Sequence, residues 1–73
     1  MAIKDRFGSN VRRFRERAGL SQDALAHTAD LHRVYLSGIE RGKRSPSIET
    51  VEKLANALGI GPGELFADQP DDA

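Results

Sequence analysis

The chain has 73 residues, 30% of them charged, with no cysteine and a formal net charge of zero. This length suits one small domain, and the lack of cysteine excludes a disulfide framework or a thiolate metal site. No apolar run approaches the roughly 20 residues that span a bilayer, and the charged first ten residues do not resemble a signal peptide. We expect a cytoplasmic protein with no membrane partner.

The zero net charge conceals two halves of opposite sign. Residues 1–44 contain ten basic and five acidic residues, a balance of +5. Residues 45–73 contain one basic and six acidic residues, a balance of −5. A basic first half suits the phosphates of a nucleic acid, whereas the same charges also serve simply to solvate helix faces. Composition leaves both interpretations open.

The first predicted element is an amphipathic helix over residues 3–18. Its apolar positions repeat with helical spacing at Phe7, Val11, Phe14 and Ala18. Gly19 supplies the left-handed backbone that commonly ends a helix. Basic residues cover the rest of this helix, and for Arg12 and Arg13 we expect a solvated face.

Two short helices joined by a tight turn are predicted between Ser21 and Arg41. Ser21 begins the first helix, because its hydroxyl accepts a backbone N–H that the first turn leaves unpaired. Asp30 adopts the left-handed backbone of the turn, though less readily than glycine. Leu36 and Ile39 face inward along the second helix. Helices this short must cross steeply, which is the helix-turn-helix arrangement.

The segment after the second short helix predicts a loop and a longer helix. Residues 41–46 contain the glycine, serine and proline typical of loops. Ser47 then caps a fourth helix, which Gly59 ends. The positions expected to face the core along this helix are Ile48, Val51, Leu54, Ala55 and Leu58.

The C-terminal residues predict a last helix and a tail. Pro62 suits a first helical position, so a short fifth helix is expected over residues 62–66. The remainder, residues 67–73, is small, acidic and prolyl, which predicts a disordered tail. We therefore predict an all-α, compact five-helix domain over residues 1–66.

The helix-turn-helix region matches a known pattern. Residues 22–26 read QDALA and residues 31–42 read LHRVYLSGIERG. Together with PSIETV over 46–51 and LGI over 58–60, they resemble the phage-repressor and Cro type of helix-turn-helix domain, the XRE family. The run YLSGIE is especially similar to the controller proteins of restriction–modification systems. This resemblance implies a lambda-repressor-like fold and a homodimer that binds a symmetric operator in double-stranded DNA. If the resemblance extends to the controller proteins, it also implies that the protein regulates its own gene.

The sequence departs from the family pattern at two positions. The family usually has glycine where this chain has Asp30, which costs about 1 kcal/mol. Several phage relatives carry a base-reading side chain where this chain has Gly38. Gly38 cannot read a base, and we expect it to permit a close approach instead.

Candidate base-contacting residues lie at the exposed side of the second short helix. Arg33 is placed near its start, and a guanidinium can bond both O6 and N7 of guanine. Val34 points the same way, towards a thymine methyl, and Ser37 follows one turn later. The alternatives are a solvated or phosphate-bound Arg33, a partly buried Val34 and a phosphate-bound Ser37. His32 is either a helix cap or a DNA contact.

Candidate phosphate-contacting residues surround that helix. Gln22 opens the preceding helix, where free N–H groups and the helix dipole favour a phosphate. Tyr35 is a core ring, a ring with its hydroxyl on a phosphate, or both. Lys43 and Arg44 lie in the following loop and are expected to bind backbone phosphates.

Two further sets of residues are predicted to have structural roles. The family resemblance pairs Arg15 with Glu40, and such a pair fixes the recognition helix if it is partly buried, or adds little if exposed. The last turn is more apolar than a small domain requires, at Ile60, Leu65 and Phe66. These three residues form a dimer interface, or close the core, or do both in part.

Catalysis has little support in the sequence. His27 and His32 are poorly spaced for a shared metal ion, and no nucleophile, glycine-rich phosphate loop or recognisable carboxylate pair is present. We expect no enzyme activity, no metal, no cofactor and no small-molecule ligand. The predicted function is a sequence-specific, duplex-DNA-binding transcriptional regulator. The alternative is a protein–protein interaction module on the same fold, such as an antitoxin or anti-repressor partner.

Overall fold

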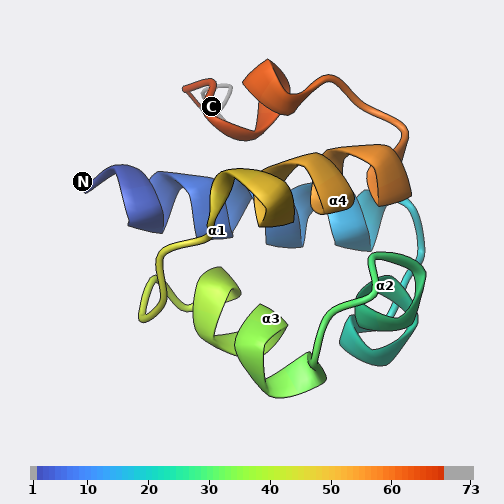
Figure 1. Ribbon diagram of the computed structural model, residues 1–73. Helices are drawn as coiled ribbons and strands as arrows, with labels where there is room; N and C mark the ends of the chain where they lie inside the picture. The colour runs from blue at the N-terminus through green and yellow to red at the C-terminus, as the bar shows by residue number, and fades with distance from the viewer. Residues whose placement is uncertain (1, 69–73) are drawn as a thin grey trace.

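The computed structural model describes residues 2–68, which fold as helices without strands. The elements are α1 (Ile3–Arg17), α2 (Gln22–Thr28), α3 (Arg33–Glu40), α4 (Ile48–Leu58) and a 3-10 helix, η1 (Pro62–Leu65). In Figure 1, α1 and α4 cross the middle of the molecule, with α2 and α3 on one side and η1 on the other. No helix in the described part of the chain is both long and apolar enough to cross a membrane.

The prediction of a fifth α-helix is wrong. The expected helix over residues 62–66 is a single 3-10 turn, in which Glu64 N–H donates to the Gly61 carbonyl and Phe66 N–H donates to the Gly63 carbonyl. Two glycines flank Pro62 within four residues, and so short a segment closes i→i+3 bonds more readily than an α-helical turn. The all-α class stands, with four α-helices among residues 2–68.

The predicted caps define most helix ends. The hydroxyl oxygen of Ser21 accepts from Ala24 N–H at 3.0 Å, and that of Ser47 accepts from Thr50 N–H at 3.1 Å. Asp30 has a φ of +57°, the left-handed conformation that the turn requires. His32 occupies the N-cap position of α3, but its side chain makes no capping hydrogen bond.

The core draws on all four α-helices and η1. Its buried apolar residues are Phe7, Val11, Leu25, Ala26, Ala29, Leu36, Ile39, Leu54, Ala55 and Leu65. Phe14 packs against the edge of this cluster. Ala18, predicted on the same stripe of α1, is exposed because the helix ends at Arg17.

One predicted core position of α4 is wrong. Ile48 is 85% exposed, because it is the first residue of the helix and lies before the turns that pack inward. Thr50 takes the inward place and is buried. Its hydroxyl is 3.0 Å from that of Ser47 and 3.4 Å from that of Tyr35, which satisfies a polar group in the core.

Two glycines allow α1 to lie directly against the end of α3. A Cβ on Gly8 would overlap the carbonyl oxygen of Ile39 and come within 3.0 Å of that of Glu40. Gly42 has a φ of +73°, and a Cβ there would overlap the carboxylate of Asp5. Backbone therefore meets α1 at both places, which fixes where α3 ends.

The segment after η1 returns to α1. Asn10 is fully buried, and its side-chain amide donates to the carbonyls of Leu65 and Ala67 at 2.9 and 2.8 Å. Arg6 and Asp68 form an ion pair at 3.1 Å. Contacts with α1 thus extend two residues into the predicted disordered tail, whose other residues, 69–73, lie outside the described part of the chain.

Candidate nucleic-acid interface

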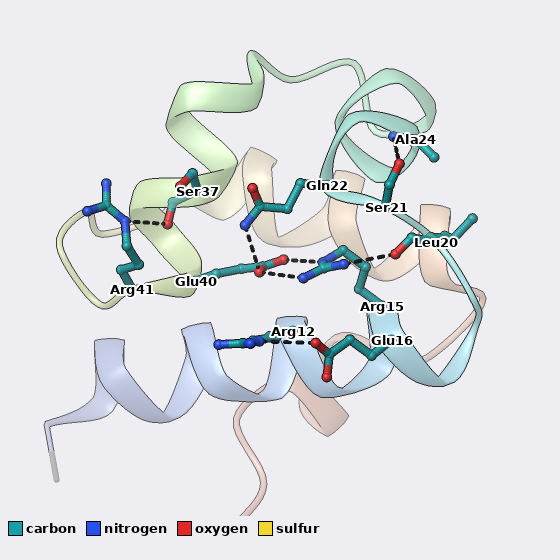
Figure 2. Close-up of polar contacts among 10 residues, drawn as sticks. All are labelled: Arg12, Arg15, Glu16, Leu20, Ser21, Gln22, Ala24, Ser37, Glu40 and Arg41. Carbon is teal, nitrogen blue, oxygen red and sulfur yellow. Dashed lines mark hydrogen bonds and ion pairs between the residues drawn. The ribbon is translucent and has the colours of Figure 1, made fainter.

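A buried polar network behind α3 joins α1, α2 and α3 (Figure 2). Arg15 donates from Nε to Glu40 Oε2 at 2.7 Å and from Nη2 to Glu40 Oε1 at 3.1 Å. Its Nη1 donates to the carbonyl of Leu20 at 2.8 Å. Gln22 Nε2 donates to Glu40 Oε1 at 3.0 Å. The arginine fork therefore links α3 to α1, and the Gln22 amide links α3 to α2.

Burial makes this network costly to break at one partner. The side chains of Arg15 and Glu40 are only 11% and 3% exposed. The hydrogen bond to Glu40 raises the pKa of Arg15, against desolvation, which lowers it. Because the shift is upward, the contribution of Arg15 to stability is present below the ordinary arginine pKa and is lost as pH rises through the higher folded-state value. Removing one partner would leave the other charge buried and unpaired.

The same network limits one predicted phosphate contact. Gln22 lies at the start of α2, as expected, but one N–H of its amide is bound to Glu40. The amide has a second N–H, and its carbonyl oxygen can only accept. Gln22 therefore has at most one free side-chain donor for a phosphate.

The three predicted base-contacting residues lie on α3, away from the network. Arg33 is exposed, Val34 is 77% exposed and Ser37 is half-buried. Leu36 and Ile39, between and beyond them, are fully buried. The helix thus has one face in the core and one face that carries Arg33 and Val34 to solvent.

Arg33 has an ionic partner that sequence reasoning missed. Its Nε lies 2.9 Å from Oδ1 of Asp23 on α2, and the two side chains are 60% and 77% exposed. The residues are ten apart across the turn, so no helical spacing rule connects them. Only the packing of α2 against α3 brings them together.

Tyr35 and Gly38 of α3 form a second cluster with Arg44 of the following loop. The guanidinium carbon of Arg44 lies 5.7 Å from the centroid of the Tyr35 ring. A Cβ on Gly38 would come within 2.5 Å of Arg44 Cγ, and the Gly38 carbonyl accepts the backbone N–H groups of Lys43 and Arg44. The close approach expected at Gly38 is therefore that of the chain's own Arg44.

A set of cations lies at the end of α3 and in the loop that follows. Lys43 and Arg44 are exposed, as is Arg41, which sequence reasoning left out. Arg41 Nε lies 3.4 Å from the Ser37 carbonyl, and Figure 2 shows its guanidinium reaching outward beyond this contact. The i, i+4 spacing from Ser37 is the signal that could have placed Arg41 beside it. Within residues 2–68, none of these three cations forms an ion pair.

This geometry agrees with what comparisons with known proteins find. A helix-turn-helix family model (HTH_3) matches residues 11–65. The chain belongs to the helix-turn-helix family. That result confirms the family resemblance inferred from the sequence.

Similar members of the helix-turn-helix family are control proteins. Control protein C.BamHI of Bacillus amyloliquefaciens is 47% identical over 61 residues, which cover 82% of this chain and 75% of that protein. Control protein C.MunI of Mycoplasma sp is 46% identical over 67 residues, 90% of each chain. The crystal structure of the restriction-modification controller protein C.AhdI from Aeromonas hydrophila matches with a TM-score of 0.84 and 46% identity, over 86% of this chain and 96% of that one.

The predicted dimer interface needs a correction. Leu65 is fully buried inside the domain, so it closes the core and cannot contact a partner. Ile60 is half-buried and packs against the core. Phe66 is 38% exposed, with its ring centroid 5.0 Å from that of Phe7. Of the three predicted residues, Phe66 presents the most apolar surface to solvent.

An apolar hollow lies beside Phe66. It has a volume of about 220 Å³, and its lining includes Ile3, Pro46, Ile48 and Phe66. Ile3 and Ile48 are 63% and 85% exposed. Large apolar side chains that gather at one exposed place typically mark an interaction surface. We name Ile3, Ile48 and Phe66 the apolar patch.

Proposed function

We propose that this chain is a transcriptional regulator that binds double-stranded DNA sequence-specifically, as a homodimer on a symmetric operator. Its family and its control-protein relatives support the regulatory role. The observation that carries the proposal is the position of Arg33, exposed at the start of a helix whose other face is fixed by the buried Arg15–Glu40 pair. The proposal places the protein in the cytoplasm, with DNA as its partner.

In this proposal α3 enters the major groove and reads base edges. The N-terminal part of a recognition helix is the part that meets them, and Arg33 is the first residue of α3. Its guanidinium would bond O6 and N7 of a guanine. The exposed methyls of Val34 would contact a thymine methyl, and Ser37 would reach a base or phosphate one turn later.

Phosphate contacts would set the register on the duplex. Lys43 and Arg44 are exposed in the loop after α3, and the Tyr35 ring under Arg44 would help to orient it. The Tyr35 hydroxyl and the free N–H of Gln22 are further donors. Autoregulation, by binding upstream of the chain's own gene, extends the proposal on the strength of the resemblance to controller proteins.

The homodimer would form through the apolar patch. Two recognition helices placed about 34 Å apart would cover two half-sites, whereas one covers too few base pairs for specific affinity. We expect Ile48→Glu to convert the dimer to monomer in analytical ultracentrifugation. Val34→Glu is a matched control, because Val34 is an exposed apolar residue of α3 that lies outside the apolar patch. A monomeric wild type, or a dimer that survives Ile48→Glu, would refute this part.

Duplex binding across a salt series tests the whole proposal. A dimer that contacts six to ten phosphates should lose about 10³–10⁵ in affinity between 50 and 200 mM salt. Fluorescence anisotropy on labelled duplexes of random and selected sequence measures this loss. Absent or salt-insensitive binding to every duplex, including the DNA upstream of its own gene, would instead favour the protein–protein interaction module.

A further inference from the structure

We infer that Asp23 is a specificity-determining residue: its carboxylate holds the Arg33 guanidinium so that the pair prefers the edge of a guanine to a phosphate. This inference rests on the proposed function. It begins from the ion pair across the helix-turn-helix, in which Asp23 Oδ1 lies 2.9 Å from Arg33 Nε. Both side chains are mostly exposed, so the pair lies at the surface that would face DNA.

The geometry of the pair leaves the base-reading atoms free. A guanidinium has five N–H donors, and the contact with Asp23 is an ion pair at Nε, 2.9 Å from Oδ1. The two terminal nitrogens keep their donors in a planar fork, which matches O6 and N7 of guanine. Asp23 thus restrains a long, flexible side chain at its Nε, and that side chain stays 60% exposed.

The charge of the pair discriminates between two kinds of partner. A carboxylate beside Arg33 offsets its positive charge and repels an approaching phosphate, so the pair gains little from the DNA backbone. The edge of a guanine is neutral and suffers no such repulsion. Arg41, Lys43 and Arg44 form no ion pair with any residue in 2–68, and they remain available for phosphates.

No other acidic residue of the helix-turn-helix has this position. Glu40 is buried against Arg15 on the opposite side of α3. Asp30 lies in the turn, 4.0 Å from Lys53 of α4. Among the described acids, Asp23 alone is therefore placed to bias what Arg33 binds.

The variant Asp23→Asn tests the inference, because it removes the charge and keeps the shape. The probes are two duplexes of equal length, one selected by the wild type from random DNA and one scrambled. We expect the scrambled duplex to bind about threefold to tenfold more tightly, with a salt slope steeper by about one. The selected duplex should change by less than about twofold, so the ratio of the two affinities falls.

Two further variants separate this effect from a general change in charge. Asp30→Asn removes the same charge from the same region, and asparagine tolerates the positive φ at this position. It should tighten both duplexes equally and leave their affinity ratio unchanged. In an Arg33→Ala background, Asp23→Asn should no longer alter the ratio, because the side chain through which Asp23 acts is gone.

The outcomes distinguish failure of the proposed function from failure of the role inferred for Asp23. A wild type that binds no duplex refutes the proposed function, and the role of Asp23 with it. If the wild type is selective, two results refute the inference alone. One is an affinity ratio that Asp23→Asn leaves unchanged, and the other is a ratio that Asp30→Asn lowers by as much as Asp23→Asn does. Circular dichroism and thermal unfolding of each variant check that the fold is retained, and the exposure of Asp23 predicts that it is.

Discussion

The two faces of α3 carry the same kind of ion pair in different surroundings. On the inner face, Arg15 and Glu40 are almost completely buried and share two hydrogen bonds. On the outer face, Arg33 and Asp23 are exposed and share one contact. The two pairs differ in the cost of breaking them, because water competes with an exposed pair and is largely excluded from a buried one.

The comparison explains how one short helix combines a fixed position with a surface free to bind. Breaking the inner pair leaves an unpaired charge buried, so α3 cannot tilt without a large cost. Breaking the outer pair costs under about 1 kcal/mol, so Arg33 can exchange partners. Substitutions on the inner face should therefore change stability, and those on the outer face should change binding.

The largest effect is expected at Glu40. Glu40→Ala removes the acceptor shared by Arg15 and Gln22 and should lower the free energy of unfolding by about 3–5 kcal/mol. A domain of this size has roughly 4–11 kcal/mol in total, so much of the protein should unfold in mild denaturant. Urea denaturation followed by circular dichroism measures the change.

An exposed pair on α1 provides the control for that experiment. Arg12 and Glu16 form an ion pair at 3.2 Å, with side chains 64% and 56% exposed. Arg12→Ala should change the free energy of unfolding by less than about 0.5 kcal/mol. Similar losses in Arg12→Ala and Glu40→Ala would contradict the contrast between buried and exposed pairs.

Gly8→Ala should have the next largest effect on stability. The added methyl would overlap the Ile39 carbonyl and force α1 away from α3, at a cost of about 1–3 kcal/mol. Gly63→Ala is the control, because a Cβ there meets nothing within 4 Å. Thermal unfolding of the two variants should show a clear drop for the first alone. Equal midpoints would mean that the two helices are not fixed by this contact.

Gly38→Ala should have a smaller effect on stability but weaken DNA binding. The methyl would displace the Arg44 stem, while the better helix propensity of alanine returns up to about 1 kcal/mol. We expect every duplex to bind less tightly, by about threefold to tenfold, with a salt slope lower by about one. Unchanged affinity and salt slope would show that Arg44 does not depend on Gly38 for its position.

Local sequence signals predicted most of the fold. Helical spacing of apolar residues and the caps at Ser21 and Ser47 correspond to the observed helices, because each depends on neighbours within one or two turns. The errors lie at the ends of elements. The inward prediction for Ile48 fails because a first turn need not pack, and residues 62–66 are too few to fix an α-helix.

The candidate site was less predictable, because its contacts join distant residues. Exposure of Arg33 and Val34 follows from the burial of their neighbours on α3, which periodicity predicts. The partner of Arg33 and the bond from Gln22 to Glu40 depend instead on how helices pack. No spacing rule within a single helix gives such contacts.

The most direct test of the account is the base preference of Arg33→Ala. Bound sequences are selected from random duplexes with the wild type and with the variant, and the two preferences are compared position by position. We expect one base position in each half-site to lose its preference, by about 1–3 kcal/mol, while the other positions and the thermal stability stay unchanged. Uniformly weaker binding to all sequences, with the pattern intact, would show that Arg33 contacts a phosphate and does not read a base.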